Sequence, residues 1–300
     1  MKFLKKAFLA FLLILTLICF GFYFYFDQKF SPEENYLTVK NESGKVIVKW
    51  LGENKNVMLL PVHLQNDSTT YFMQFDTGSP NTLFYENSLA IFKNKNQVKT
   101  QFTIGSTEVS SDRFKIISIG KDNDKNSIKI IGTIGSDLLD QKKTIINFKE
   151  NYIVFNILKE PKSFSNSKLD FKFKKRKIII LGTLNGKEEQ FLYDSGTSAY
   201  ELLTNKNAWQ KLKLSNYSTP VVEKAQSWER TLTSYTAKSN KIIKFKNKEL
   251  LLSEVTYIEG FSQSQYMLMK FSGMTGMLGN KIFLKNTLYI DCKEEKISIN

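Results

Sequence analysis

Hydrophobic and polar residues alternate along most of the chain after about residue 45. Runs such as VIVKWL, VMLLPVHL and YFMQF are bounded by clusters of Asn, Asp, Ser and Gly, which is the pattern of short strands and hairpins. Helical periodicity is scarce, and Asn205 to Leu212 is one short candidate helix. The sequence therefore predicts a mainly β fold.

The N-terminus has a different pattern, because the run from Ala7 to Phe26 carries no charge. It is as long as a membrane-crossing helix requires, and it follows Lys2, Lys5 and Lys6, a positive flank that predicts a cytosolic N-terminus. We therefore expect a single-pass inner-membrane protein of the cell envelope, with everything after Asp27 outside the cytosol.

Secretion after signal cleavage is the alternative for this segment. Cys19 and Gly21 have the spacing of small residues at a cleavage site, and the apolar run before them would suit a signal peptide. The aromatic cluster from Phe20 to Phe26 is typical of a membrane interface and favours an uncleaved anchor.

Two pairs of segments repeat each other in the same order. LLPVHLQNDSTTYFMQFDTGS contains Asp76, and IIILGTLNGKEEQFLYDSGTS contains Asp194. Downstream, IGTIGSDLLDQKKTIINFK (131–149) matches TGMLGNKIFLKNTLYIDCK (275–293). This repetition predicts two related β lobes. We expect a membrane segment over 1–27, a stalk and first lobe over 28–158, a linker over 159–171 and a second lobe over 172–300.

Composition narrows the chemistry to carboxylates. The net charge is +14, but Lys residues are spread along the chain without a nucleic-acid-binding motif, so we expect no nucleic-acid partner. Cys19 and Cys292 are the only cysteines, and His63 is the only histidine and lies in a predicted strand. A disulfide framework, a zinc site and a Ser-His-Asp triad are therefore not expected, nor is any metal or cofactor.

The repeated motif is an apolar strand running into D-[ST]-G-[ST], followed later by two further residues and Gly. The later triplets are Thr133, Ile134, Gly135 and Met277, Leu278, Gly279. This double motif resembles the pepsin-like and retropepsin-like aspartic proteases, and the resemblance covers nearly all of the chain after the N-terminal segment. It implies two β-barrel-like lobes with the active site between them, a polypeptide substrate, and a monomer, because both lobes are in one chain.

The resemblance also implies roles for the residues of the motif. Asp76 and Asp194 would form a pair of carboxyl groups that share one proton, activate a water and polarise the scissile carbonyl. Gly135 and Gly279 would pack beneath the active-site loops, whereas Asp137 is expected to be a solvated surface group, as is Asp291. The supporting loop residues would be Thr77 and Ser195 as a crossed hydroxyl pair, Gly78 and Gly196 as amide donors at close approach, and Ser79 and Thr197 as hydroxyls bonding the outer carboxylate oxygens.

The two halves differ in the length between the aspartate and the later glycine, which is 59 residues in the first half and 85 in the second. The first half has room only for a hairpin within the sheet, at 101–111. The added segment of the second half (225–241) contains Trp228 and Tyr235. It predicts a lid from the second lobe, in which Trp228 or Tyr235 would face the cleft, although for each ring taken singly ordinary aromatic packing is favoured.

Three function classes follow from these observations. The first is an aspartic endopeptidase, and the second is a peptide-binding pseudoprotease of the same fold whose aspartates are idle. The third is a polyanion-binding envelope protein that uses the net charge and would lose affinity steeply with salt.

Overall fold

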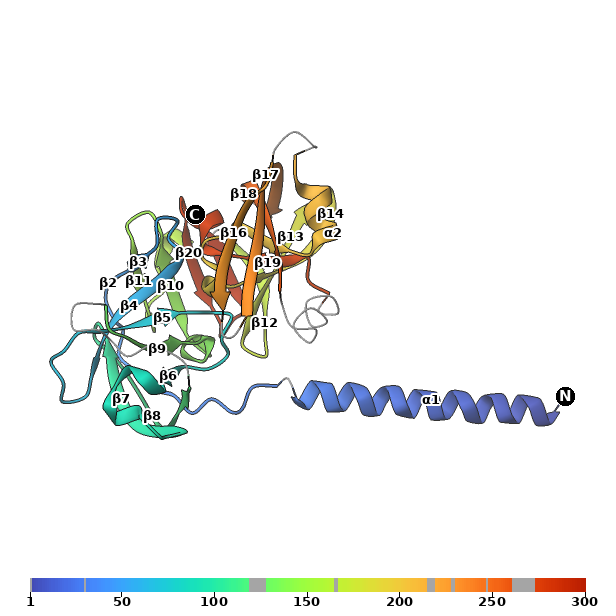
Figure 1. The fold of residues 1–300 in the computed structure, drawn as a ribbon, viewed down its shortest axis with the longest axis horizontal. Helices are drawn as coiled ribbons and strands as arrows, with labels where there is room; N and C mark the ends of the chain where they lie inside the picture. The colour runs from blue at the N-terminus through green and yellow to red at the C-terminus, as the bar shows by residue number, and fades with distance from the viewer. Residues whose placement is uncertain are drawn as a thin grey trace. The chain divides into compact units, whose positions relative to one another are not determined.

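The computed structural model describes residues 2–29, 31–118, 128–164, 167–214, 219–227, 230–246, 248–260 and 273–300 (Figure 1). The chain divides into two compact units, Met1–Glu34 and Asn35–Asn300. The first unit contains one helix, α1 (Lys2–Lys29). Within the described ranges, no helix reaches the length and apolarity that a membrane crossing requires. The helix expected over Ala7 to Phe26 is present, but its predicted crossing of a membrane is not supported.

The first lobe is a closed barrel of six strands. Its strands pair in the cyclic order β4-β5-β9-β6-β8-β7, and β7 returns to pair with β4. Side chains alternate between core and surface as the sequence predicts; in β5 the buried positions are Tyr71, Met73 and Phe75. The strands are β4 (Val57–Leu64), β5 (Tyr71–Phe75), β6 (Leu83–Tyr85), β7 (Gln97–Ile104), β8 (Thr107–Ile117) and β9 (Ile130–Ile134).

The second lobe repeats these pairings strand for strand. The pair β14–β19 is parallel like β5–β9, the pair β15–β18 is parallel like β6–β8, and β17 pairs with β13 as β7 pairs with β4. The repeat read from the sequence is therefore also a repeat of strand order. The strands are β13 (Lys177–Leu184), β14 (Lys187–Tyr193), β15 (Leu202–Thr204), β17 (Arg230–Phe245), β18 (Lys248–Glu259) and β19 (Gly276–Leu278).

A central sheet joins the lobes through the antiparallel pair β10 (Lys143–Asn147) and β20 (Thr287–Asp291). In this pair Ile145 lies opposite Tyr289, and each follows its lobe's later glycine by the same number of residues, so the register places equivalent positions face to face. The sheet continues on one side through β11 and β2 and on the other through β21 and β12. These strands are β2 (Val46–Ile47), β11 (Tyr152–Val154), β12 (Lys168–Lys174) and β21 (Lys296–Ile299).

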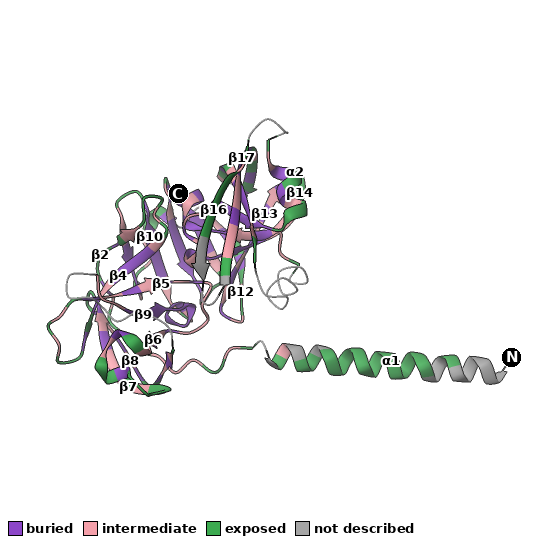
Figure 2. Ribbon diagram, in the orientation of Figure 1, coloured by how far each residue is buried: buried purple, intermediate pink, exposed green. Residues whose placement is uncertain are grey.

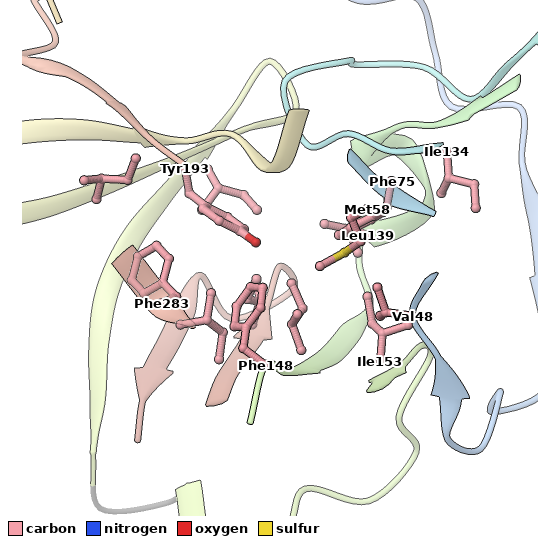
Figure 3. Close-up of a cluster of buried hydrophobic side chains, with 14 of the residues drawn as sticks. Val48, Met58, Phe75, Ile134, Leu139, Phe148, Ile153, Tyr193 and Phe283 are labelled. Carbon is pink, nitrogen blue, oxygen red and sulfur yellow. The ribbon is translucent and has the colours of Figure 1, made fainter. Parts of the chain in front are cut away.

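One hydrophobic core runs through both lobes. Figure 2 shows buried positions inside each lobe and along the central sheet. In Figure 3, Met58 and Phe75 of the first lobe lie across from Tyr193 and Phe283 of the second, with Phe148 between them. All five are buried members of a single cluster. Because Phe75 and Tyr193 directly precede the two aspartates, the core fixes the strand ends from which the aspartates project.

The remaining elements flank the lobes. The predicted short helix is confirmed as α2 (Lys206–Leu212), which begins where the Asn205 side chain accepts a hydrogen bond from the Ala208 amide at 3.0 Å. The predicted first-lobe hairpin is confirmed as β7–β8. The other elements are β1 (Thr38–Lys40), β3 (Lys49–Leu51), β16 (Val221–Ser227), and the 3₁₀ turns η1 (Glu86–Ser88), η2 (Ala90–Phe92), η3 (Ser136–Leu139), η4 (Lys162–Phe164), η5 (Ser195–Thr197) and η6 (Asn280–Phe283).

Two aspartates expected at the surface are buried. Asp137 is 5% exposed and accepts hydrogen bonds from the amide and hydroxyl of Thr82, both at 2.6 Å, while Asp291 is 1% exposed and accepts from the amides of Lys293 and Glu294. The prediction was wrong because these loops have unpaired backbone donors that a buried carboxylate can satisfy.

Candidate active site

The two aspartates come together at the ends of matching strands. Asp76 follows β5 and its amide donates to the Ile134 carbonyl at 3.0 Å, while Asp194 follows β14 and its amide donates to the Leu278 carbonyl at 2.9 Å. Each aspartate is thus tied by the same backbone bond to the strand before its lobe's later glycine. The structure therefore brings together residues that lie 118 positions apart in the sequence.

A reciprocal set of hydrogen bonds joins the two loops. The Thr77 amide donates to Ser195 Oγ and the Ser195 amide donates to Thr77 Oγ1, both at 2.9 Å. The hydroxyls in turn donate across the lobes, Thr77 Oγ1 to the Tyr193 carbonyl and Ser195 Oγ to the Phe75 carbonyl, both at 3.0 Å. Both hydroxyl residues are fully buried. The predicted crossed hydroxyl contact is confirmed.

The loop glycines allow close approach between the lobes. Gly78 donates its amide to Asp76 Oδ1 and Gly196 donates its amide to Asp194 Oδ1, both at 2.8 Å. A Cβ on Gly78 would lie 2.5 Å from Asp194 Oδ1, and a Cβ on Gly196 would lie 2.6 Å from the carboxyl carbon of Asp76. Each glycine thus bonds its own lobe's aspartate and leaves room for the carboxyl group of the other lobe.

Burial and mutual repulsion favour a shared proton at this pair. Burial, and then the negative charge of Asp76, raise the pKa of Asp194 to about 7, and the hydrogen bond from the Gly196 amide and the charge of Lys177 oppose this rise. Burial also raises the pKa of Tyr193, which precedes Asp194. Asp194 therefore holds its proton at pH values below about 7.

The outer hydroxyls make different bonds from those predicted. Ser79 Oγ donates to the Asn81 carbonyl at 2.9 Å, and Thr197 Oγ1 donates to the Asp194 backbone carbonyl at 2.9 Å. In the first loop it is the Ser79 amide that reaches the carboxylate, at 3.2 Å from Asp76 Oδ1. The prediction was wrong because these hydroxyls close local turns instead.

The later glycines lie directly under the loops, as predicted. A Cβ on Gly135 would overlap the backbone of Asn81, and a Cβ on Gly279 would overlap the carbonyls of Thr197 and Tyr200. Asn280, which the sequence did not single out, supports the second loop: its amide group donates to Ser198 Oγ at 3.0 Å and its Oδ1 accepts from the Tyr193 hydroxyl at 2.8 Å.

Lys177 is a second residue that the sequence did not single out. It begins β13, and its ammonium donates to the Gly78 carbonyl of the first loop. Arg176, just before it, is buried and donates from a guanidinium nitrogen to Asn81 Oδ1 at 2.8 Å. Two consecutive basic residues of the second lobe therefore hold the active-site loop of the first. Nothing in the local sequence distinguishes them from the other basic residues.

A cleft of about 820 Å³ lies beside the Asp194 loop. The hairpin β16–β17 forms one wall through Val221, Glu223, Ser234 and Thr236, which share one face of the hairpin because Val221 pairs with Thr236 and Glu223 with Ser234. The remaining lining comes from the second loop (196–200), Lys224, Glu254, Lys281 and the first-lobe residues Asn54 and Asn56. The second lobe thus supplies a hairpin along one side of the cleft.

The aromatic residues predicted for this hairpin are not seen to line the cleft. Tyr235 stacks on Tyr257 with ring centroids 4.6 Å apart, and its hydroxyl donates to Glu259 at 3.2 Å. It lies between Ser234 and Thr236, so strand alternation turns it to the opposite face, and the favoured interpretation of ordinary packing holds. Trp228 lies outside the described residues.

Metal binding has no evident donor set in the part of the chain that the structure describes, where no group of three or more His, Cys, Asp or Glu side chains is arranged to hold an ion. No protein-family model and no curated protein matches the chain.

Proposed function

We propose that the protein is an aspartic endopeptidase related to the pepsin-like and retropepsin-like proteases, with Asp76 and Asp194 as its catalytic pair. One observation supports this above all others. The two carboxyl groups occupy equivalent positions in the two lobes. Reciprocal hydrogen bonds between Thr77 and Ser195 hold together the loops that carry them. An accidental pair of turn aspartates would not have matched bonds on both sides.

The protonation of the pair suits hydrolysis of an amide. Asp194 keeps its proton up to a pH of about 7, so it can donate to the oxygen of the scissile carbonyl. Asp76 would then take a proton from the attacking water while the water oxygen bonds to the carbonyl carbon. Asp76 passes this proton to the leaving nitrogen, Asp194 takes back a proton from a hydroxyl of the tetrahedral intermediate, and the C–N bond breaks to release the amine and the carboxylic acid.

The cleft supports an extended polypeptide as substrate. The hairpin β16–β17 presents the polar side chains of Glu223, Ser234 and Thr236 to the cleft, beside the loop of Asp194. An extended chain can place successive side chains in such a groove while its backbone bonds to the hairpin.

The test is cleavage of an unbiased peptide library by the full chain, kept in solution with a mild detergent, from acidic to neutral pH. We expect cleavage by the wild type and a loss of roughly a hundred- to ten-thousand-fold in Asp76→Asn and in Asp194→Asn. Asp112→Asn, which changes an exposed aspartate, is the matched control and should cleave normally. A folded wild type that binds peptides without cleaving them would favour the pseudoprotease.

A further inference from the structure

Lys177 breaks the symmetry of the two lobes at the active site. It is the first residue of the eight-residue strand β13, and Val57 is the first residue of the matching eight-residue strand β4. The next residues, Ile178 and Met58, are both fully buried. Ile178 pairs with Tyr193, the residue before Asp194, and the pairing of Leu59 with Gln74 sets the same register between β4 and the strand that ends at Asp76. The strand positions are therefore equivalent, while one carries an ammonium group and the other an apolar side chain.

The ammonium group is fixed close to the aspartates. It donates to the Gly78 carbonyl, and Gly78 itself lies against Asp194, since a Cβ at this glycine would be 2.5 Å from Asp194 Oδ1. The backbone just before Lys177 is also held, because Ser136 Oγ donates to the Arg176 carbonyl at 2.6 Å. Lys177 thus has little freedom to turn its charge toward solvent.

The surrounding groups make this positive charge significant. Asp76 and Asp194 interact with Lys177 electrostatically, Tyr85 lies near Asp76, and Tyr193 precedes Asp194. Arg176 is directed to other partners, with its guanidinium on Asn81 and 3.8 Å from Asp140 Oδ2. Among the described residues, Lys177 therefore places a positive charge beside the aspartate pair, whereas the neighbouring Arg176 is directed elsewhere.

We propose that Lys177 is a positioning residue that fixes the first active-site loop at Gly78 and holds one negative charge on the pair of Asp76 and Asp194. The part of this proposal that concerns turnover rests on the proposed protease activity. The physical reason is that a lone negative charge is costly to bury, and a fixed ammonium group offsets that cost.

The direction of the effect on pH dependence follows from the charges. Burial lowers the pKa of Lys177, and both carboxylates oppose this decrease, while Lys177 in turn lowers the pKa of Asp194. Removing the ammonium group should therefore raise the pH at which the pair loses each of its protons. Both limbs of the pH–rate profile should move to higher pH, by about one unit for a nearby opposite charge.

The experiment compares Lys177→Met, Lys177→Gln and Lys177→Arg with the wild type. Lys174→Met is the matched control, because Lys174 is the exposed cross-strand partner of Lys177. Two readouts are taken on the full chain: the pH profile of peptide cleavage, and a titration of ¹³C-labelled aspartate carboxyl groups by NMR. The signals of the pair are assigned by their loss in Asp76→Asn and Asp194→Asn.

We expect Lys177→Met and Lys177→Gln to raise the pH midpoints at which the pair titrates by about one unit. Lys177→Arg and Lys174→Met should leave these midpoints near the wild-type values. If Lys177→Gln and Lys177→Met slow cleavage without moving the titration, the residue serves the loop through its hydrogen bond alone and the proposed role of its charge is overturned. The NMR titration decides the matter even if the wild type cleaves no peptide, so failure of the protease assignment and failure of this inference can be told apart.

Discussion

The two lobes agree at the reacting groups and differ around them. Both supply an aspartate, an amide-donating glycine and a buried hydroxyl that reaches across to the other lobe. The groups that bond the aspartate loops are thus present in both lobes. The ammonium group of Lys177 and the strand β16 beside the cleft occur in the second lobe alone among the described residues.

The difference is also visible beneath the loops. Two residues after its later glycine the first lobe buries Asp137, while the second lobe has Lys281, which lies 2.7 Å from Glu254 beside the cleft. The same backbone position therefore serves internal hydrogen bonding in one lobe and lines the candidate binding surface in the other.

Among changes to the residues around the aspartates, the largest effect should come from filling the space between the loops. Gly78→Ala and Gly196→Ala each place a methyl group against the carboxyl group of the opposite lobe, and we expect each to lower the rate of peptide cleavage by roughly 100-fold, because displacement of about 1 Å at a catalytic group has an effect of this size. Gly21→Ala is the control, since a Cβ there meets open space. A large loss in only one of the two loop variants would contradict the equivalence of the loops.

A smaller effect should come from Asp137, which is buried in the first lobe alone and should make the free energy of unfolding depend on pH. Burial raises the pKa of Asp137 from 3.8 to about 6, so the folded state holds this proton more tightly than the unfolded state. The stability that this proton contributes is fully present below pH 3.8 and is lost as the pH rises through 6. A shift of about two units corresponds to about 3 kcal/mol.

Denaturant unfolding at several pH values measures this contribution. Between pH 4 and pH 7 the free energy of unfolding of Asp137→Asn should fall less steeply than that of the wild type, by up to about 3 kcal/mol. The difference between the two curves gives the contribution of Asp137 to the free energy of unfolding, separate from that of the pair of Asp76 and Asp194. Parallel curves for the two proteins would show that this carboxyl group is already ionised in the fold at low pH.

The smallest effect should come from the crossed hydroxyls, and it should be alike in the two lobes. Thr77→Val leaves the Ser195 amide without its buried acceptor, and Ser195→Ala does the same to the Thr77 amide. We expect each variant to lose about 2 kcal/mol of unfolding free energy in urea. Ser68→Ala, at an exposed hydroxyl, should lose almost none. Losses that differ several-fold between Thr77→Val and Ser195→Ala would show that one lobe depends less on the contact.

The parts of the site that the sequence predicted are those that lie within a few residues of the motif. Asp76 and Asp194, the donor glycines and the crossed hydroxyls follow from D-T-G and D-S-G after apolar strands. Alternation and turn residues likewise predicted the mainly β fold and the first-lobe hairpin, and helical periodicity predicted the short helix, because these are local signals.

The errors and omissions concern contacts between distant segments. Lys177 is one of 43 basic residues, and only the packing of β13 against the first loop distinguishes it. Asp137 was misjudged because its partner Thr82 lies 55 positions away. For Tyr235 the favoured interpretation of ordinary aromatic packing holds, and polar Ser234 and Thr236 on either side already indicated which face would line the cleft. The membrane crossing, which is not supported, was inferred from the length of the uncharged run, its positive flank and its aromatic cluster.

The register of β10 against β20, with Ile145 opposite Tyr289, is the kind of contact that two identical subunits make across a two-fold axis. In a homodimer of that design every substitution is inherited by both halves. A lysine at the position of Lys177 would then appear twice and place two ammonium groups beside the pair of carboxyl groups. In a single chain the two halves can differ, so one half carries an ammonium group at this position while Val57 keeps the equivalent position apolar in the other half.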